Sequence, residues 1–373
     1  MGAAPGFRCS ETPVFFPQAL LDKMVRYGWE LYQQLALNPA YKDASETAIP
    51  AQFRVPNEAA HPLFVQADFG LVQAPDGSLE PKLVEIQGFP SIYGLQLALA
   101  NAYRRTYRLH DLEPHLTVFL EGLDEHGYIE LLRRAILNQH APEEVILLEI
   151  DPYQQKTLPD FLVTEKLLGL KIAGINEVRK QGRKLYFNGT QIKRIYNRVI
   201  VDELLRKNIQ ADFKFTDDLD VEWAGHPNWF FRLSKFSLPW FRHVSVPETW
   251  FLSDLKQLPD GLDQYVLKPL YSFAGLGVKI GPSKEEIAAI PHQKRGDFIL
   301  QRKVNFVPTI ATPSGMTKAE IRVMYVRDGG ELKATTTVIR TGRGKMMGVD
   351  FNKDVDWVGA SAGFYIPGST FPS

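Results

Sequence analysis

The chain has 373 residues, and its 43 lysine and arginine residues equal its 43 aspartate and glutamate residues, so the formal net charge is zero. This balance excludes a general electrostatic attraction to nucleic acid or to an anionic membrane, and any bound anion must be held by a local cluster of cations. Apolar residues make up 45% of the chain, enough to bury a core, and the single cysteine, Cys9, excludes an intramolecular disulfide and a cysteine-based zinc site.

The sequence favours a cytoplasmic protein without a membrane anchor. Residues 1–16 lack the basic start and apolar run of a signal peptide. No stretch approaches the ~20 apolar residues that span a bilayer. We therefore expect neither membrane nor nucleic acid as a partner, and a homodimer if the chain self-associates.

The first 125 residues predict two helices and a hairpin. Apolar residues recur at helical spacing over residues 20–37, and a second helix is expected over residues 94–107. Between them, residues 64–72 and 82–87 are predicted strands joined by a turn at residues 75–78, where an Asp-Gly pair favours tight reversal.

Residues 126–225 predict a small α/β unit. The continuous apolar run at 145–150 is typical of a strand buried in a parallel sheet. A helix is expected over residues 160–168, ending at Gly169, followed by strands at 184–187 and 192–196 on either side of an Asn-Gly turn. Alternating strands and helices indicate α/β architecture.

Two further units are predicted at residues 226–305 and 306–373. The first contains a helix around Lys235, a strand at residues 264–269, a glycine-bearing loop and a strand at residues 297–304. The second is rich in strands, with turns near residues 328–330 and 340–344.

The first candidate binding segment is the strand that carries Lys268 and the loop after it, which contains Ser272, Gly275 and Gly277. Glycines let backbone N–H groups approach phosphate oxygens, and the lysine adds a positive charge. The segment is neither a Walker loop nor a dinucleotide-binding fingerprint. A tight hairpin with a surface lysine is the alternative.

Two later segments carry further candidates. The strand that ends in Gln301, Arg302, Lys303 and Val304 could offer backbone groups to an adenine edge, or could simply be a buried strand. Glu320 and Arg322 are two residues apart on a predicted strand and therefore share a face. Three cations crowd the next glycine-rich turn and could hold a phosphate or a carboxylate, or could be solvated: Arg340, Arg343 and Lys345.

The hairpin near the N-terminus suggests a metal site. Asp68 lies on its first strand, and Glu85 and Gln87 lie on one face of its second. Side chains on neighbouring strands can share an ion. Carboxylate and amide oxygens are suitable ligands for Mg²⁺, although an outward polar face would give the same pattern.

Together these segments resemble the ATP-grasp superfamily. The Lys268 strand with its glycine loop, the His226-Pro-Asn segment that leads to Lys235, the strand at 298–304 and the strands of Arg322 and Arg340 follow the family's order. The metal segment around Glu85, however, stands near the beginning of the chain. Eukaryotic glutathione synthetase and glutathionylspermidine synthetase carry this kind of permutation.

The resemblance implies an α/β (α+β) ATP-grasp fold, circularly permuted, with a small Rossmann-like substrate unit. Residues 1–125 would supply the metal hairpin and pack with the C-terminal part, residues 126–225 the substrate unit, and residues 226–305 and 306–373 the two ATP-grasp subdomains. It further implies an ATP- and Mg²⁺-dependent ligase that joins a carboxylate to an amine, or to a thiol, through an acyl phosphate.

The resemblance also implies roles for individual residues. Lys235 and Lys268 would hold phosphates, with a lid at residues 272–277, and Arg322 and Arg340 would stabilise the transferred phosphoryl group. The substrate contacts we hypothesise are Ser91, Tyr93, Arg198 and Arg343. Two alternatives stay open. One is a kinase-like enzyme that releases ADP without forming an amide, and the other is a nucleotide-binding protein without catalysis, for which the main argument is that Gln87 stands where the family usually has asparagine.

Overall fold

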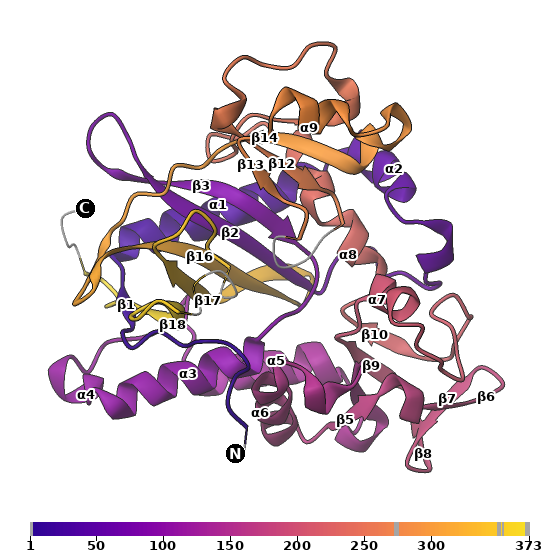
Figure 1. The fold of residues 1–373 in the computed structure, drawn as a ribbon. Helices are drawn as coiled ribbons and strands as arrows, with labels where there is room; N and C mark the ends of the chain where they lie inside the picture. Colours follow the sequence, from indigo (N-terminus) through magenta and orange to yellow (C-terminus); the bar gives the residue numbers. More distant parts are fainter. Residues whose placement is uncertain (1–2, 272–275, 349–351, 353, 370–373) are drawn as a thin grey trace.

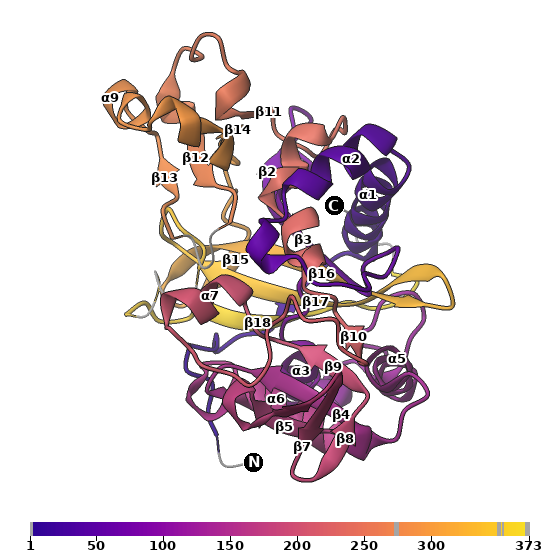
Figure 2. The same cartoon turned by 90° about the vertical axis from the view of Figure 1, so that its right-hand side faces the viewer.

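The computed structural model describes residues 3–271, 276–348, 352 and 354–369, which form a mixed α/β fold with several sheets (Figures 1 and 2). The largest sheet has seven strands, and we call it the central sheet. Its order is β1-β18-β17-β16-β2-β3, with β15 beside β16. The strands are β1 (Val14–Phe15), β2 (Phe64–Gln73), β3 (Leu79–Gln87), β15 (Ile310–Thr312), β16 (Gly315–Asp328), β17 (Glu331–Gly342) and β18 (Gly359–Phe364).

Strands from the two ends of the chain meet in this sheet. The predicted hairpin is confirmed as β2 and β3, and β2 pairs antiparallel with β16 so that Asp68 lies opposite Arg322. These two residues are 254 positions apart in the sequence. The sheet is therefore completed only when the N-terminal hairpin docks against the C-terminal strands.

Helices cover both faces of the central sheet (Figure 2). On one face α1 (Gln18–Ala36) packs its apolar stripe on alternate residues of β2 and β16. The opposite face carries α3 (Tyr93–Thr106) and α5 (Glu125–Leu137). Because strand side chains alternate, Asp68 and Arg322 project on the face away from α1.

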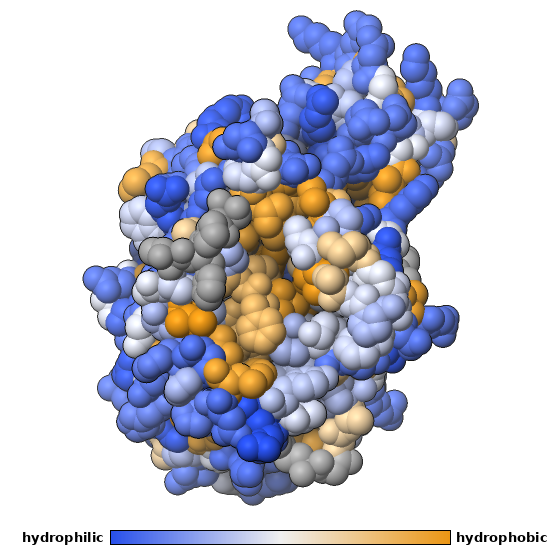
Figure 3. All heavy atoms as spheres, turned by 90° about the vertical axis from the view of Figure 1, so that its left-hand side faces the viewer, coloured by the Kyte–Doolittle hydropathy of each residue, from blue (hydrophilic) through white to orange (hydrophobic). Residues whose placement is uncertain are grey.

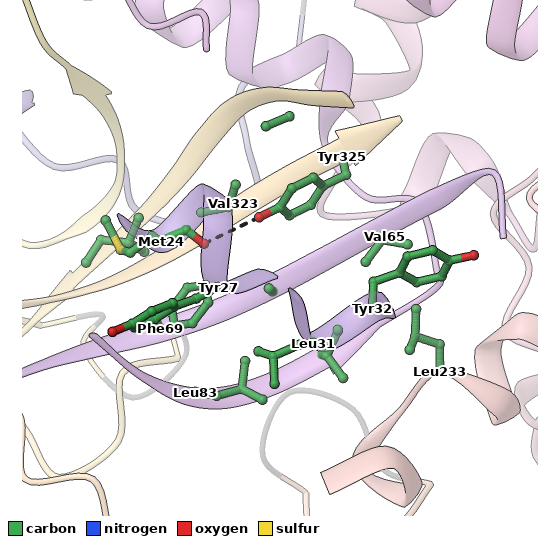
Figure 4. Close-up of a cluster of buried hydrophobic side chains, with 14 of the residues drawn as sticks. Met24, Tyr27, Leu31, Tyr32, Val65, Phe69, Leu83, Leu233, Val323 and Tyr325 are labelled. Carbon is green, nitrogen blue, oxygen red and sulfur yellow. Dashed lines mark hydrogen bonds between the residues drawn. The ribbon is translucent and has the colours of Figure 1, made fainter. Parts of the chain in front are cut away.

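The core beneath α1 is shown in Figure 4. Met24 and Leu31 point from α1 onto the sheet, and the Tyr325 hydroxyl donates a hydrogen bond to the Val25 carbonyl at 2.8 Å. Gly28 makes this approach possible, because a Cβ there would lie 2.2 Å from the Tyr325 hydroxyl oxygen. Helix α1 is thus held to the sheet by the close contact with Tyr325 as well as by the burial of its apolar side chains.

A second, parallel sheet forms the small α/β unit, with the order β10-β9-β4-β5. Its strands are β4 (Val145–Glu149), β5 (Lys171–Gly174), β9 (Arg194–Asn197) and β10 (Glu222–Ala224), and α6 (Leu158–Leu168) packs beside them. The predicted single strand at 192–196 is wrong. Its first residue ends β8 (Thr190–Ile192), which pairs with β7 (Lys184–Phe187) in a separate antiparallel sheet, whereas β9 pairs with β4 and β10.

The third sheet, which we call the upper sheet from its place in Figure 1, has the order β11-β14-β12-β13. Its strands are antiparallel: β11 (Thr249–Phe251), β12 (Tyr265–Pro269), β13 (Lys279–Ile280) and β14 (Phe298–Arg302). The predicted helix around Lys235 is present as a 3-10 helix, Lys235–Trp240, and not as an α-helix, because its interior Pro239 lacks the N–H that an α-helix needs.

A small antiparallel sheet has the order β6-β7-β8, with β6 at Arg179–Gln181 and β7 at Lys184–Phe187. The remaining helices are α2 (Pro39–Thr47), α4 (Leu109–Leu112), α7 (Val201–Arg206), α8 (Asn228–Arg232) and α9 (Lys284–Ala288). Within the described residues, none of the helices has both the length and the apolar character to span a bilayer.

Candidate functional site

A cavity of about 990 Å³ lies where the three sheets meet. Its wall comes from the central sheet, from the upper sheet and from the loops that follow the parallel strands β4 and β9. Figure 3 shows one face of the molecule, where apolar residues gather in a hollowed band below the mostly hydrophilic lobe at the top. Thirteen of the predicted site residues line the cavity: Asp68, Glu85, Gln87, Ser91, Arg198, Lys235, Lys268, Gln301, Arg302, Lys303, Val304, Arg322 and Arg340.

The other predicted residues lie elsewhere. Tyr93 is buried at the start of α3, and its hydroxyl donates to the Tyr325 carbonyl at 2.9 Å, so it belongs to the core and is not part of the cavity wall. Arg343 donates to Thr312 Oγ1 and to the Asp356 carbonyl, and is also absent from the wall. Gly277 has a left-handed φ of 73° and is not in the wall either.

Two of the predicted loop residues, Ser272 and Gly275, lie outside the described residues.

Strand register builds a charged cluster on the central sheet, made of Asp68, Glu320, Arg322 and Arg340, which we call the central cluster. Arg322 faces Asp68 across β16 and β2, and Glu320 faces Arg340 across β16 and β17. Arg322 donates to both Asp68 carboxylate oxygens, at 2.6 and 2.7 Å, and Arg340 donates to Asp68 Oδ2 at 2.6 Å and to Glu320. Bidentate pairs of this kind hold a guanidinium in one orientation.

Burial and charge oppose each other within the central cluster. Burial by itself would raise the pKa of the Asp68 carboxyl, but the Arg322 and Arg340 guanidinium groups outweigh it and hold that pKa below its usual value. Burial raises the pKa of the Glu320 carboxyl, and Arg340 opposes the rise. Asp68 therefore stays ionised and keeps both arginines in place.

Two lysines stand beside the central cluster. Lys268 on β12 donates to Gln301 Oε1 at 2.6 Å and to the Val84 carbonyl at 3.0 Å, and the Lys235 ammonium lies 3.0 Å from Glu85 Oε1. Burial lowers the pKa of Lys268 to about 8, because the charged form loses its hydration. With all groups ionised, four cations face three carboxylates here, so the site has one net positive charge and suits an anion.

The residues predicted to bind Mg²⁺ fit that role only in part. Both oxygens of Asp68 already accept hydrogen bonds from arginines, so this residue acts as their partner and not as a free ligand. Glu85 and Gln87 share a face of β3 and line the cavity. The part of the chain that the structure describes holds no group of three His, Cys, Asp or Glu suited to a metal, but Mg²⁺ often takes one carboxylate and completes its shell with phosphate oxygens and water.

Another part of the cavity wall, which we call the parallel-sheet end, is formed by Ser91, Glu149 and Arg198. Arg198 donates to Asp160 Oδ2 at 2.8 Å in a fully buried ion pair. Glu149 ends β4 and accepts a hydrogen bond from the Ile150 N–H at 2.7 Å, and burial raises its pKa to about 8. Crevices beyond the carboxyl ends of parallel strands are common ligand sites.

The sequence analysis missed Glu149. A carboxylate within the last two residues of a continuous apolar run is the signal that could have identified it, because such a residue stands near the open edge of a buried strand. The cation predicted to contact substrate, Arg198, does lie beside it in the cavity wall.

Comparisons with known proteins identify the fold. No family model and no curated protein matches the sequence. The structure is similar to that of a glutathione synthetase-like effector from Globodera pallida in its apo form, with a TM-score of 0.60 and 13% sequence identity over 96% of this chain and 90% of that chain. This similarity shows that the two chains share a fold, and the ATP-grasp resemblance and the circular permutation stay predictions.

Proposed function

We propose that the chain is an ATP-dependent ligase that joins a carboxylate to an amine through an acyl phosphate. The observation that carries the proposal is the cavity itself, which brings Lys235, Lys268, Arg322 and Arg340 from four separate elements into one wall. These are the cations that the resemblance assigns to a triphosphate. A kinase-like enzyme would use the same cations, so the reaction product distinguishes the two.

The nucleotide would lie between the upper sheet and the central sheet. Lys268 and Lys235 would hold its phosphates, and residues 301–304 would border its base. ATP supplies the phosphoryl group that activates a carboxylate. Burial around Lys268 strengthens its attraction to an anion, because the effective dielectric constant is lower there than in water.

Arg322 and Arg340 would stabilise the charge of the transferred phosphoryl group. Since Asp68 and Glu320 already fix their orientation, little reorganisation would accompany the reaction. Mg²⁺ would be held by Glu85 and Gln87, with phosphate oxygens completing its shell. Asp68 would act as a positioning residue for both arginines.

The acceptor substrate would occupy the parallel-sheet end. Arg198 and Ser91 would contact it as the sequence predicts, and Glu149 adds a carboxyl that titrates near neutral pH. A group with such a pKa can take a proton from an ammonium ion before that amine attacks.

The strand pairing supports a permuted chain order. In this structure the hairpin with Glu85 and Gln87 precedes the strands of the upper sheet in sequence, yet it pairs with β16, which follows them. The metal-binding hairpin of residues 1–125 would then complete the C-terminal subdomain.

One observation favours a nucleotide-binding protein without catalysis as the second candidate. Asp68 is neutralised by two arginines, which leaves fewer oxygens for a metal than the resemblance implies. Such a protein would bind ATP but release no ADP.

Calorimetry of ATP binding, with and without Mg²⁺, tests the proposal. Lys268→Ala should lose most of the affinity, and Glu85→Ala only the Mg²⁺-dependent part. Lys284→Ala, which changes an exposed lysine on α9, is the matched control and should bind as the unmodified protein does. Assays of ADP release with mixtures of amino acids and peptides would then separate ligase from binding protein. Absence of nucleotide binding by the unmodified protein would contradict the proposal.

A further inference from the structure

Gln66 on β2 is a buried glutamine whose amide connects two parts of the cavity wall. Its side chain is fully buried, at 0% exposure, and is not itself part of the wall. Arg322 of the central cluster donates to Gln66 Oε1 at 3.1 Å, and Gln66 Nε2 donates to the Ser91 carbonyl at 3.2 Å. Both Arg322 and Ser91 line the cavity. A single amide therefore lies between the central cluster and the parallel-sheet end.

The orientation of this amide is fixed by its two partners. A guanidinium group has only donors, so it must meet the amide oxygen, and a backbone carbonyl only accepts, so it must meet the amide nitrogen. Rotating the amide by half a turn would break both hydrogen bonds and leave buried polar groups without partners. Glutamine therefore fits this place, because glutamate would have no donor for the Ser91 carbonyl and methionine would have neither group.

The chain is strained directly after Ser91. Ile92 has a φ of 54°, in the left-handed region that a β-branched side chain rarely adopts. Such a conformation persists only where the surrounding structure holds it in place. Ile92 lines the cavity and directly precedes Tyr93, the first residue of α3. The strain therefore lies in the cavity wall, and contacts on both sides are needed to maintain it.

The turn at residues 91–95 has such contacts on both sides. On one side is the hydrogen bond from Gln66. On the other side the Leu95 N–H donates to Asp160 Oδ1 at 2.9 Å, while Asp160 Oδ2 accepts from Arg198. Each contact leads to an arginine of the cavity wall, one in the central cluster and one at the parallel-sheet end. The turn is therefore positioned relative to both arginines.

We propose that Gln66 is a positioning residue that holds the acceptor-binding turn at Ser91 in place relative to Arg322, and so couples acceptor binding to phosphoryl transfer. The inference rests on the proposed function and deepens it, because that function requires a carboxylate oxygen of the acceptor to bond to the γ-phosphorus of ATP as ADP leaves. Misplacement of reacting groups by about 1 Å can cost a factor of roughly 100 in rate. Arg322 keeps its hydrogen bonds to Asp68 without Gln66, so ATP binding should not depend on this amide.

The test is the rate of ADP release with ATP, Mg²⁺ and a mixture of amino acids and peptides of fixed composition. The rate is measured once against ATP concentration and once against dilution of the mixture. In Gln66→Met the maximal rate should fall roughly tenfold and the half-saturating concentration of the mixture should rise, while that of ATP stays unchanged. The matched control is Gln96→Met, which should change none of these values. Gln96 is 2% exposed and donates to the Ser361 carbonyl at 3.2 Å, and neither residue is part of the cavity wall.

Destabilisation alone would affect Gln66→Met and Gln96→Met alike, so equal rates for these two variants would overturn the inference. Gln66→Glu keeps an acceptor for Arg322 but has no donor for Ser91, so a rate equal to that of the unmodified protein would overturn it as well. Hydrogen exchange of residues 88–96 should be faster in Gln66→Met than in the unmodified protein, and equal exchange would contradict the inference. If the unmodified protein itself releases no ADP, the proposed function fails, and the inference falls with it.

Discussion

The central cluster and the parallel-sheet end hold buried charge in two different ways within one cavity. In the central cluster each carboxylate lies opposite an arginine by strand register, so charge is compensated wherever the sheet forms. At the parallel-sheet end Glu149 is held by a backbone N–H, and its pKa rises to about 8. The first arrangement should resist changes of pH, and the second should respond to them.

Removing one carboxylate should break the central cluster, and we expect this change to have the largest effect on the free energy of unfolding. Asp68→Ala leaves Arg322 and Arg340 without their shared partner, and breaking a buried pair in this way costs about 3–5 kcal/mol of unfolding free energy. Urea unfolding monitored by circular dichroism measures it. The control is Asp218→Ala, which breaks an exposed pair with Arg183 and should leave the midpoint unchanged. If Asp68→Ala and Asp218→Ala have the same urea midpoint, the ion pairs that the strand register forms in the central cluster do not stabilise the fold.

The titration of Glu149 tests the difference in pH response between the central cluster and the parallel-sheet end. The pKa of Glu149 is about 8 in the folded chain and about 4.3 when unfolded, so between these values the folded state binds the extra proton. Stability should therefore fall as pH rises from about 4.3 to 8, by at most about 1.4 kcal/mol per pH unit from this group, and level off above 8.

Glu149→Gln should remove this slope, so the variant should gain stability relative to the unmodified protein at pH 8 but not at pH 4.5. Urea unfolding at these two pH values is the measurement, and Glu143→Gln, an exposed position just before β4, is the control. A slope that survives in Glu149→Gln would mean that another group carries the titration.

Lys268 on the upper sheet gives the smallest expected effect. Its ammonium is buried and donates to Gln301 and to the Val84 carbonyl. With a pKa of about 8, most of its charge is lost by pH 9, so affinity for tripolyphosphate should fall roughly tenfold between pH 7 and 9. The methionine of the Lys268→Met variant cannot titrate. The ratio of the two proteins' affinities at each pH therefore removes the contribution of the ligand's own titration. If both proteins show the same pH profile, Lys268 does not contact the anion.

Much of the local structure could be predicted from the sequence. The hairpin of β2 and β3 follows from alternating apolar residues around an Asp-Gly turn, and α1 follows from apolar residues at helical spacing. The shared face of Glu320 and Arg322 follows from the period of a strand. One local prediction failed, because the run at 192–196 divides between two sheets. The helix predicted at Lys235 formed as a 3-10 helix, because Pro239 cannot continue an α-helix.

The sequence by itself thus determined the β2–β3 hairpin, helix α1 and the strand face that Glu320 and Arg322 share. The tertiary structure alone decided what those charges do. Asp68 became the partner of Arg322 and Arg340 because β2 pairs with β16 across 254 residues, and no local pattern specifies that pairing. Tyr93 packs in the core because it stands at the start of α3. The pKa values of Glu149 and Lys268 depend on burial by segments that are distant in sequence.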